Sequence, residues 1–276
     1  MSDFIGTKLT MNLGERSYDI ILKNGALENL YQFARLDRKV AVVTDSGVPA
    51  EYAQRVADQC REAKIITVPQ GEGSKSFKIL ETVLRQMLEF NMGRGDLVVA
   101  VGGGVVGDLA GFAAAIYMRG IDFINCPTTT LSMIDSSIGG KTAVDLGDTK
   151  NIVGAFWQPK LVIVDPDTLS TLPRRHYING LAEAVKAGLL ADPELFAIFE
   201  KGDIDTQISE IIYRSLRFKK NVVEQDETER GMRKALNFGH TIGHGIEAVK
   251  GIKGRRTVGL FHGECVALGM LPMIES

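Results

Sequence analysis

The sequence predicts an α/β fold in which a doubly wound parallel-sheet domain is followed by an all-helical domain. Short β-branched runs alternate with helical patterns through the first 170 residues, at 39–44, 64–68, 96–101, 122–126 and 161–165. The runs are apolar on both faces, as strands covered by helices on each side are. From Tyr177 onward apolar residues recur only at helical spacing. We therefore predict a doubly wound α/β domain at 1–172 and a helical domain at 173–276.

The individual elements follow in chain order. Residues 8–22 have the pattern of a hairpin or an edge strand. Between the second and third runs, Leu80, Val83, Leu84, Met87 and Leu88 form the apolar stripe of an amphipathic helix. The second domain has helical patterns at 181–190, 195–199, 208–218 and 240–249. The chain stops soon after the apolar stretch CVALGM at 265–270, which has no evident cap, so we expect the helical domain to be C-terminally incomplete.

Composition excludes several classes of protein. The 276 residues include 32 Lys and Arg against 34 Asp and Glu, a net charge of −2. The chain therefore lacks the excess of positive charge expected of a protein that binds nucleic acid or a membrane surface. The apolar stretch 97–118 carries Asp108 and five glycines, which favours a strand, a loop and a helix over a membrane span. Three widely spaced cysteines and no secretory leader predict a cytoplasmic location.

Two glycine-rich segments are candidates for phosphate binding. Gly102–Asp108 (GGGVVGD) follows a predicted strand and opens a predicted helix, where backbone N–H groups and the helix dipole favour a pyrophosphate. A tight strand-to-helix turn with no ligand explains the same residues about as well. Gly71–Lys75 (GEGSK) is a second candidate, or a solvated turn. The segment SSIGGKT at 136–142 is not a P-loop, because Asp135 stands where that motif requires glycine.

Histidines cluster late in the chain. His240 and His244 share one helix face, and His262 follows within a chain that has four histidines in all. With Glu183 as the carboxylate they suit a site of two histidines and one acid for a divalent metal. Periodicity leaves open whether His244 is a ligand or a proton shuttle. The spacing is not H-E-x-x-H, which disfavours a zinc protease.

Several charged residues near these motifs are ordinary when each is taken alone. Lys150, Lys219 and Arg233 have the spacing of solvated charges. Glu183 and Lys186 could form a surface i, i+3 pair.

Together the segments resemble the 3-dehydroquinate synthases over the whole chain. The matching motifs are GEGSK at 71–75, GGGVVGDLAGFAAAIYMRG at 102–120, PTTTLSMIDSSIGGKTAVD at 127–145, KNIVGAFWQP at 150–159, LAEAVKAGLL at 181–190, RKALNFGHTIGH at 233–244 and HGECVALGM at 262–270. Their number and order make the resemblance far more specific than any single glycine loop.

The resemblance implies a set of cofactors and site residues. A divalent zinc or cobalt ion would be held by Glu183, His240 and His262, with His244 a catalytic residue on the substrate side. The catalytic set would further include Asp135, Lys141 and Lys186. NAD would contact Asp45, Glu72, Lys75, Gly103, Gly104, Val105, Gly107, Asp108, Thr128, Thr129, Leu131, Lys141, Lys150, Thr168 and Thr171. The substrate would be bound by Lys150, Asn151, Lys219, Arg233 and Asn237, and by Arg119 of a neighbouring subunit, which implies a homodimer.

The resemblance also implies the reaction. 3-Deoxy-D-arabino-heptulosonate 7-phosphate, a phosphorylated sugar acid, would become 3-dehydroquinate and phosphate, with NAD regenerated in each turnover. Two departures from the family stand out: Gly47 replaces an asparagine found in some relatives, and the family's later helices, one of which adds a phosphate-binding lysine, lie beyond residue 276. We expect a chain ending there to bind NAD but to turn substrate over poorly. The competing interpretations are a related sugar phosphate cyclase, a polyol dehydrogenase of the glycerol dehydrogenase type, and a catalytically silent NAD-binding protein.

Overall fold

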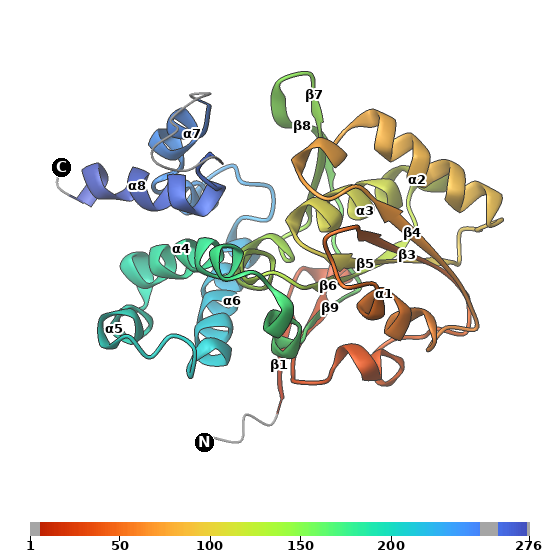
Figure 1. Cartoon of the computed structure of the whole chain (residues 1–276), viewed down its shortest axis with the longest axis horizontal. Coiled ribbons are helices and arrows are strands. Elements are labelled where there is room, and N and C mark those ends of the chain that lie inside the picture. The colour runs from red at the N-terminus through yellow and green to blue at the C-terminus, as the bar shows by residue number, and fades with distance from the viewer. Residues whose placement is uncertain (1–5, 249–258, 275–276) are drawn as a thin grey trace.

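The computed structural model describes residues 6–248 and 259–274, and it confirms the predicted fold class (Figure 1). A seven-stranded sheet has the order β1-β2-β9-β6-β5-β3-β4. Its strands are β1 (Thr7–Met11), β2 (Tyr18–Leu22), β3 (Lys39–Asp45), β4 (Glu62–Val68), β5 (Leu97–Gly102), β6 (Asp122–Pro127) and β9 (Leu161–Val164). The predicted strands therefore lie within two residues of the observed ones.

The N-terminal hairpin is also confirmed. β1 and β2 are antiparallel, and β2 then pairs in parallel with β9, so that Asp19 lies opposite Leu161. All other neighbouring strands of this sheet are parallel. The hairpin is thus joined to the sheet through a strand that follows it by about 140 residues in the chain, which ties the first residues to the end of the sheet region.

Helices cover both faces of the sheet. The strand β5 shows why: Val98 and Ala100 face a core cluster built with α2 (Phe77–Glu89) and α3 (Gly104–Ile116), whereas Val99 faces a second cluster built with α1 (Ala50–Ala57). Because alternate residues of a strand point to opposite faces, a strand with two buried faces has to be apolar throughout. All six residues of β5 are buried.

A second, two-stranded sheet was not predicted. The strands β7 (Lys141–Leu146) and β8 (Thr149–Phe156) form an antiparallel hairpin. Most of β8 is exposed, so its sequence lacks the apolar alternation that marks a half-buried strand. Gly154 permits the close pairing, because a Cβ there would lie 2.0 Å from the carbonyl oxygen of Thr142.

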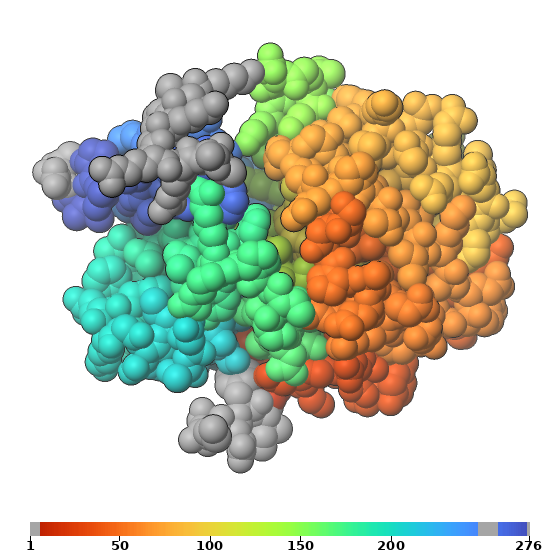
Figure 2. Space-filling view, viewed as in Figure 1, coloured from red at the N-terminus to blue at the C-terminus, as the bar shows by residue number. Residues whose placement is uncertain are grey.

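Beyond β9 the described residues contain helices and no further strand, as the sequence predicts. The longer helices are α4 (Arg174–Ala191), α5 (Pro193–Lys201), α6 (Ile208–Gln225), α7 (His240–Ala248) and α8 (His262–Ile274). Residue 249, the last of one predicted helical pattern, lies outside the described residues. Figure 2 shows α4 to α6, in green to cyan, directly beside the sheet region. The division into domains at 172/173 stays a prediction.

A third core cluster joins the helices to the sheet edge. Ile20 of the hairpin packs in one cluster with Leu181 of α4 and with Ile211 and Leu216 of α6. The short helix η5 (Ser132–Ser136), which follows β6, adds Met133 to the same cluster. Residues of the hairpin, of η5 and of α4 are therefore held at fixed distances from one another.

Two further findings bear on the predicted environment. Among the described residues, no helix is both long enough and apolar enough to cross a membrane. Cys60, Cys126 and Cys265 are all free thiols.

Candidate active site

The residues expected to contact NAD gather at one edge of the sheet. Parallel strands bring their carboxyl ends to the same edge, and ligands of such sheets bind there, above all where the strand order reverses. Here β4 and β5 flank β3 on opposite sides, so the order reverses between β3 and β5. The candidates follow the ends of successive strands: Asp45 ends β3, Glu72 and Lys75 follow β4, Gly103–Asp108 follows β5, Thr128, Thr129 and Leu131 follow β6, and Thr168 and Thr171 follow β9.

The turn after β5 has the properties of a phosphate cradle. No side chain caps the N-terminus of α3, which begins at Gly104. A Cβ on Gly104 would lie 2.9 Å from Oγ of Ser136, and one on Gly103 would lie 3.1 Å from Thr129. The Ser136 hydroxyl is buried and has no hydrogen-bond partner in the described chain. A bare helix N-terminus beside an unpaired hydroxyl fits the phosphates of a dinucleotide.

A buried ion pair lies beside this turn. Lys75, which is 4 % exposed, contacts Asp108 with its Nζ 2.7 Å from Oδ2 and also donates to Asn151. Burial raises the pKa of Asp108, and the Lys75 ammonium opposes that rise. One predicted NAD contact thus positions a second, and Lys75 also contacts the predicted substrate ligand Asn151.

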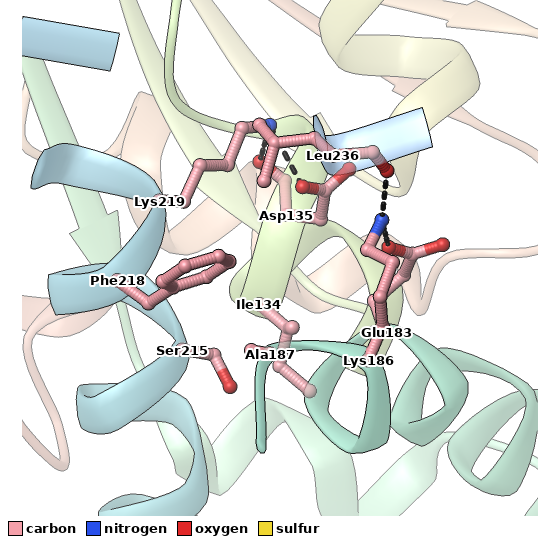
Figure 3. A pocket seen from close by; sticks show the side chains of 9 residues that line it. All are labelled: Ile134, Asp135, Glu183, Lys186, Ala187, Ser215, Phe218, Lys219 and Leu236. Carbon is pink, nitrogen blue, oxygen red and sulfur yellow. Dashed lines mark hydrogen bonds and ion pairs between the residues drawn. The ribbon is translucent and has the colours of Figure 1, made fainter. Parts of the chain in front are cut away.

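Glu183 and Lys186 do not form a surface pair, so that alternative interpretation is wrong. Both side chains lie inside a small pocket between α4, η5 and α6 (Figure 3), with exposed fractions of 2 % and 4 %. The Lys186 ammonium contacts the Glu183 carboxylate and donates to the carbonyl oxygen of Leu236 over 2.6 Å. Buried charges of this kind need partners or a ligand to offset their desolvation.

Asp135 and Lys219 form a second ion pair in the same pocket (Figure 3). Nζ of Lys219 lies 2.9 Å from Oδ1 of Asp135 and 2.7 Å from its carbonyl oxygen. Burial alone would raise the pKa of Asp135, but the ammonium groups of Lys219 and Lys186 outweigh it and hold that pKa well below its usual range. The pocket therefore presents a carboxylate between two ammonium groups, one from α4 and one from α6.

The three late histidines meet beside this pocket. His240, His244 and His262 each offer a ring nitrogen, and these nitrogens all lie within 4.8 Å of one another. His240 Nδ1 lies 3.2 Å from the carbonyl oxygen of Phe238, which leaves Nε2 directed at Glu183, 3.5 Å from its Oε1. Burial lowers the pKa of His240.

This arrangement fits a divalent metal. Both Glu183 oxygens are buried, and their described neighbours are the Lys186 ammonium and, at 3.5 Å, Nε2 of His240. A buried carboxylate beside converging imidazole rings is a donor set that zinc and cobalt take. The structure brings His244 into the cluster as closely as the other two histidines. Whether three histidines or two with Glu183 hold the ion stays a prediction.

Two acidic residues of the site were missed by the sequence analysis. Glu247 accepts from Lys150 over 2.6 Å and lies 3.3 Å from Nδ1 of His262. These contacts, with His262 first, outweigh burial and hold the pKa of Glu247 at about 2. The signal was available, because Glu247 lies three residues after His244 on one helix face. Glu229 contacts Lys141 and accepts from Asn237 over 3.2 Å, and no sequence pattern marked it.

The two arginines differ in position. Arg233 is 1 % exposed, and its terminal nitrogens donate to the carbonyl oxygens of Gly139, over 3.0 Å, and Glu227. Arg119 is exposed and follows the C-terminal end of α3, whereas the glycine turn lies at the N-terminal end of the same helix. That helix separates them by roughly 20 Å, so the structure does not bring Arg119 to the other site residues of its own chain.

Comparison with known proteins agrees with this geometry. Residues 65–179 match the family model "3-dehydroquinate synthase N-terminal", and residues 180–275 match "3-dehydroquinate synthase C-terminal". The chain is 43 % identical over 276 residues to the 3-dehydroquinate synthase of Pelobacter propionicus, covering 95 % of this chain and 76 % of that one. It is 46 % identical to that of Caulobacter vibrioides, covering 94 % and 73 %.

Solved structures show the same fold. A 2-deoxy-scyllo-inosose synthase complexed with carbaglucose-6-phosphate, NAD+ and Co2+ superposes with a TM-score of 0.82 at 27 % identity, covering 96 % of this chain and 75 % of that one. The 2-epi-5-epi-valiolone synthase of Streptomyces hygroscopicus, with NAD+ and Zn2+ bound, gives 0.82 at 29 %, covering 94 % and 74 %. A glycerol dehydrogenase of Schizosaccharomyces pombe shares the fold at 20 % identity and a TM-score of 0.66, covering 93 % and 70 %. Matched along nearly its whole length in sequence and in fold, the chain belongs to the 3-dehydroquinate synthase family.

Proposed function

We propose that this chain converts 3-deoxy-D-arabino-heptulosonate 7-phosphate into 3-dehydroquinate and phosphate, using NAD and a divalent metal. The observation that carries the proposal is the pocket formed by Asp135 and the buried Glu183, Lys186 and Lys219 beside three converging histidines, in a chain of this family. Two structural neighbours were solved with NAD+ and with Co2+ or Zn2+. They support the same two cofactors here. When bound, NAD supplies reversible hydride exchange and the metal polarises substrate oxygens.

The chain's own residues hold the substrate and its charge. Lys141, Lys150 and Asn151 lie on the β7–β8 hairpin, and Lys186 and Lys219 approach from α4 and α6. In the described structure their cationic groups face carboxylates, so a phosphorylated sugar acid would replace those partners with its own anionic groups. Lysine ammonium groups neutralise a leaving phosphate, and fixed positions lower the entropy cost of the reaction.

His244 is the candidate for moving a proton at the substrate. It is the exposed member of the histidine cluster, so a substrate hydroxyl can reach it. Burial and the neighbouring His262 lower the pKa of His244, which favours the neutral ring that accepts a proton. Its position next to the proposed metal ligands suits it to accept a proton from a substrate hydroxyl.

The alternative enzymes are less well supported. The similarity to glycerol dehydrogenase is at the level of the fold. A polyol also has no anionic group to pair with the lysines and arginines of the site. Identity to the two sugar phosphate cyclases, 27 % and 29 %, is lower than the 41–46 % shared with curated 3-dehydroquinate synthases. The retained buried charges count against a silent NAD-binding protein, since unused buried charges cost stability.

The test is an assay of phosphate release. The protein is mixed with substrate, NAD and zinc or cobalt, and phosphate is measured while absorbance follows NADH. We expect phosphate release with no net NADH, because the hydride returns within each turnover. Steady NADH accumulation with glycerol or another polyol would instead establish a dehydrogenase.

We further propose a homodimer in the cytoplasm. Arg119 is exposed and lies at the end of α3 opposite the glycine turn, which supports a role at the site of a neighbouring chain. The three free thiols agree with a reducing compartment.

A further inference from the structure

The backbone between Asp135 and Lys141 has a strained course. Gly139 and Gly140 both have positive φ, +92° and +70°, and together they turn the chain from η5 into β7. A Cβ on Gly139 would lie 2.6 Å from Nη2 of Arg233, and one on Gly140 would lie 2.6 Å from the side-chain amide of Gln158. Glycine is needed here for its conformation and for space. The course of this turn sets the distance between two residues expected to hold the substrate.

A residue of the N-terminal hairpin accepts a hydrogen bond from this turn. The N–H of Gly139 donates to Oη of Tyr18 over 3.1 Å. Tyr18 opens β2, and only 3 % of it is exposed. Burial raises the pKa of Tyr18, so the residue stays a neutral phenol, whose oxygen accepts this bond. Tyr18 itself lies in the core cluster shared by the hairpin, η5 and α4.

The carbonyl group of Gly139, which belongs to the next peptide unit, is held from the same hairpin by a second route. The carbonyl oxygen of Gly139 accepts from Arg233 over 3.0 Å, and Arg233 also donates to the carbonyl oxygen of Glu227. The Glu227 carboxylate in turn accepts two bonds from Arg16, over 3.2 and 2.6 Å. Tyr18, Gly139, Arg233, Glu227 and Arg16 thus form a closed ring of contacts that begins and ends on one hairpin.

We propose that Tyr18 is a positioning residue, which fixes the Gly139 peptide and thereby the spacing of Asp135 and Lys141. The inference rests on the proposed function only for the identity of the substrate. Without the hydroxyl, the buried N–H of Gly139 has no acceptor, so the turn shifts or opens to water. Lys141 and Asp135 then lose their mutual geometry, while the NAD turn and the histidine cluster keep theirs.

Tyr18→Phe tests this inference, with Tyr177→Phe as the matched control. Both tyrosines are buried in the same core cluster, and each variant deletes one hydroxyl, but Tyr177 interacts with Asp205 on the surface of the helical region. In hydrogen-exchange mass spectrometry, the peptide covering 137–141 should exchange about tenfold faster in Tyr18→Phe than in the control, the factor expected for one lost hydrogen bond. This readout needs no activity.

The kinetic readout separates positioning from general loss of structure. We expect Tyr18→Phe to raise KM for the substrate and to lower kcat/KM by about 10- to 100-fold. Simple destabilisation would lower kcat through the active fraction and leave KM unchanged. Arg16→Gln changes an exposed side chain, and it should raise KM by a smaller factor than Tyr18→Phe does.

The outcomes are distinct. Faster exchange of 137–141 with a raised KM supports the positioning role. Equal exchange in the two tyrosine variants, or an unchanged KM in Tyr18→Phe, overturns it. If wild-type protein releases no phosphate, the proposed function fails on its own, and the exchange comparison still decides whether Tyr18 holds the turn.

Discussion

At the scale of single residues, the site is a set of buried charges that balance one another. Glu183 and Lys186 face each other and are both buried, and the buried Lys219 faces Asp135, which is partly exposed. Removing one member of a buried pair leaves the other uncompensated, which typically costs about 3–5 kcal/mol. Substitutions here therefore act on stability as well as on activity, and a useful variant preserves volume and measures ligand binding directly.

Glu183 and His244 are expected to respond differently to substitution. Glu183→Gln keeps the side-chain shape but removes the negative charge that would bind the metal, so we expect metal and activity to be lost together. His244→Ala should abolish activity and leave the metal bound. Metal content by elemental analysis and phosphate release are the two measurements. Full metal retention in both Glu183→Gln and His262→Ala would show that the ion is held elsewhere.

At the scale of elements, the N-terminus of α3 carries the expected cofactor contact. Gly104→Val adds a branched side chain where a Cβ already lies 2.9 Å from Ser136 Oγ, which should block the approach of a pyrophosphate to the backbone. We expect NAD affinity, measured by calorimetry, to fall by at least about tenfold, which corresponds to the loss of one hydrogen bond between the backbone and the pyrophosphate. Gly95→Val is the control, because a Cβ at Gly95 meets nothing within 4 Å. Unchanged affinity in Gly104→Val would mean that the turn is only structural.

The start of α5 gives a prediction about pH. Asp192 caps this helix by accepting from the N–H of Leu195 over 3.1 Å, and Arg214 lies 2.9 Å from the same carboxylate oxygen. Burial opposes ionisation, but these contacts outweigh it and lower the pKa of Asp192. A lowered pKa in the folded state means that the stabilisation is complete above the unfolded value near ~3.9 and disappears as pH falls through the folded value.

Asp192→Asn keeps a capping side chain and removes the charge. It should lower the free energy of unfolding by about 1 kcal/mol at pH 7, because hydrogen bonds to an ionised carboxylate are stronger than those to a neutral amide. Urea unfolding at pH 7 and pH 3 measures the difference, which should shrink at the lower pH. A difference that is equal at both pH values would mean that ionisation of Asp192 contributes nothing.

The elements differ in how far the sequence predicts them. The sheet strands could be predicted because burial on both faces demands continuous β-branched runs. The hairpin β7–β8 could not, since an exposed ribbon such as 149–156 needs no apolar pattern. The same limit applies to the Glu183–Lys186 pair. Its spacing is that of any surface pair, and only the packing of α6 and η5 over α4 makes it buried. The contact of Tyr18 with Gly139 is the hardest to predict from the sequence, because the two residues are 121 positions apart in the chain.

At the scale of the whole molecule, one expected site residue belongs to a different chain. If Arg119 serves the neighbouring site, then Arg119→Ala and Lys219→Met each inactivate a homodimer but damage different halves of the site. Mixing the two should restore about a quarter of wild-type phosphate release, because half of the random dimers are mixed and each has one complete site. Subunit exchange is driven by mild denaturant and return to buffer. No recovery on mixing would place Arg119 in the site of its own chain.

The pairing of β2 with β9 has a consequence for how the protein reaches its native state. Residues 18–22 can enter the sheet only when residues 161–164 are present, so the loop that must close is about as long as a typical domain, and such distant pairings form slowly. The hydrogen bond from Gly139 to Tyr18 can form only after β2 has paired with β9. We therefore expect the substrate pocket to be completed late in folding, after the centre of the sheet. In pulsed hydrogen exchange during refolding, the amides of Val98 to Ala100 should gain protection before those of Ile20 and Ile21, and simultaneous protection would show that the hairpin docks at the outset.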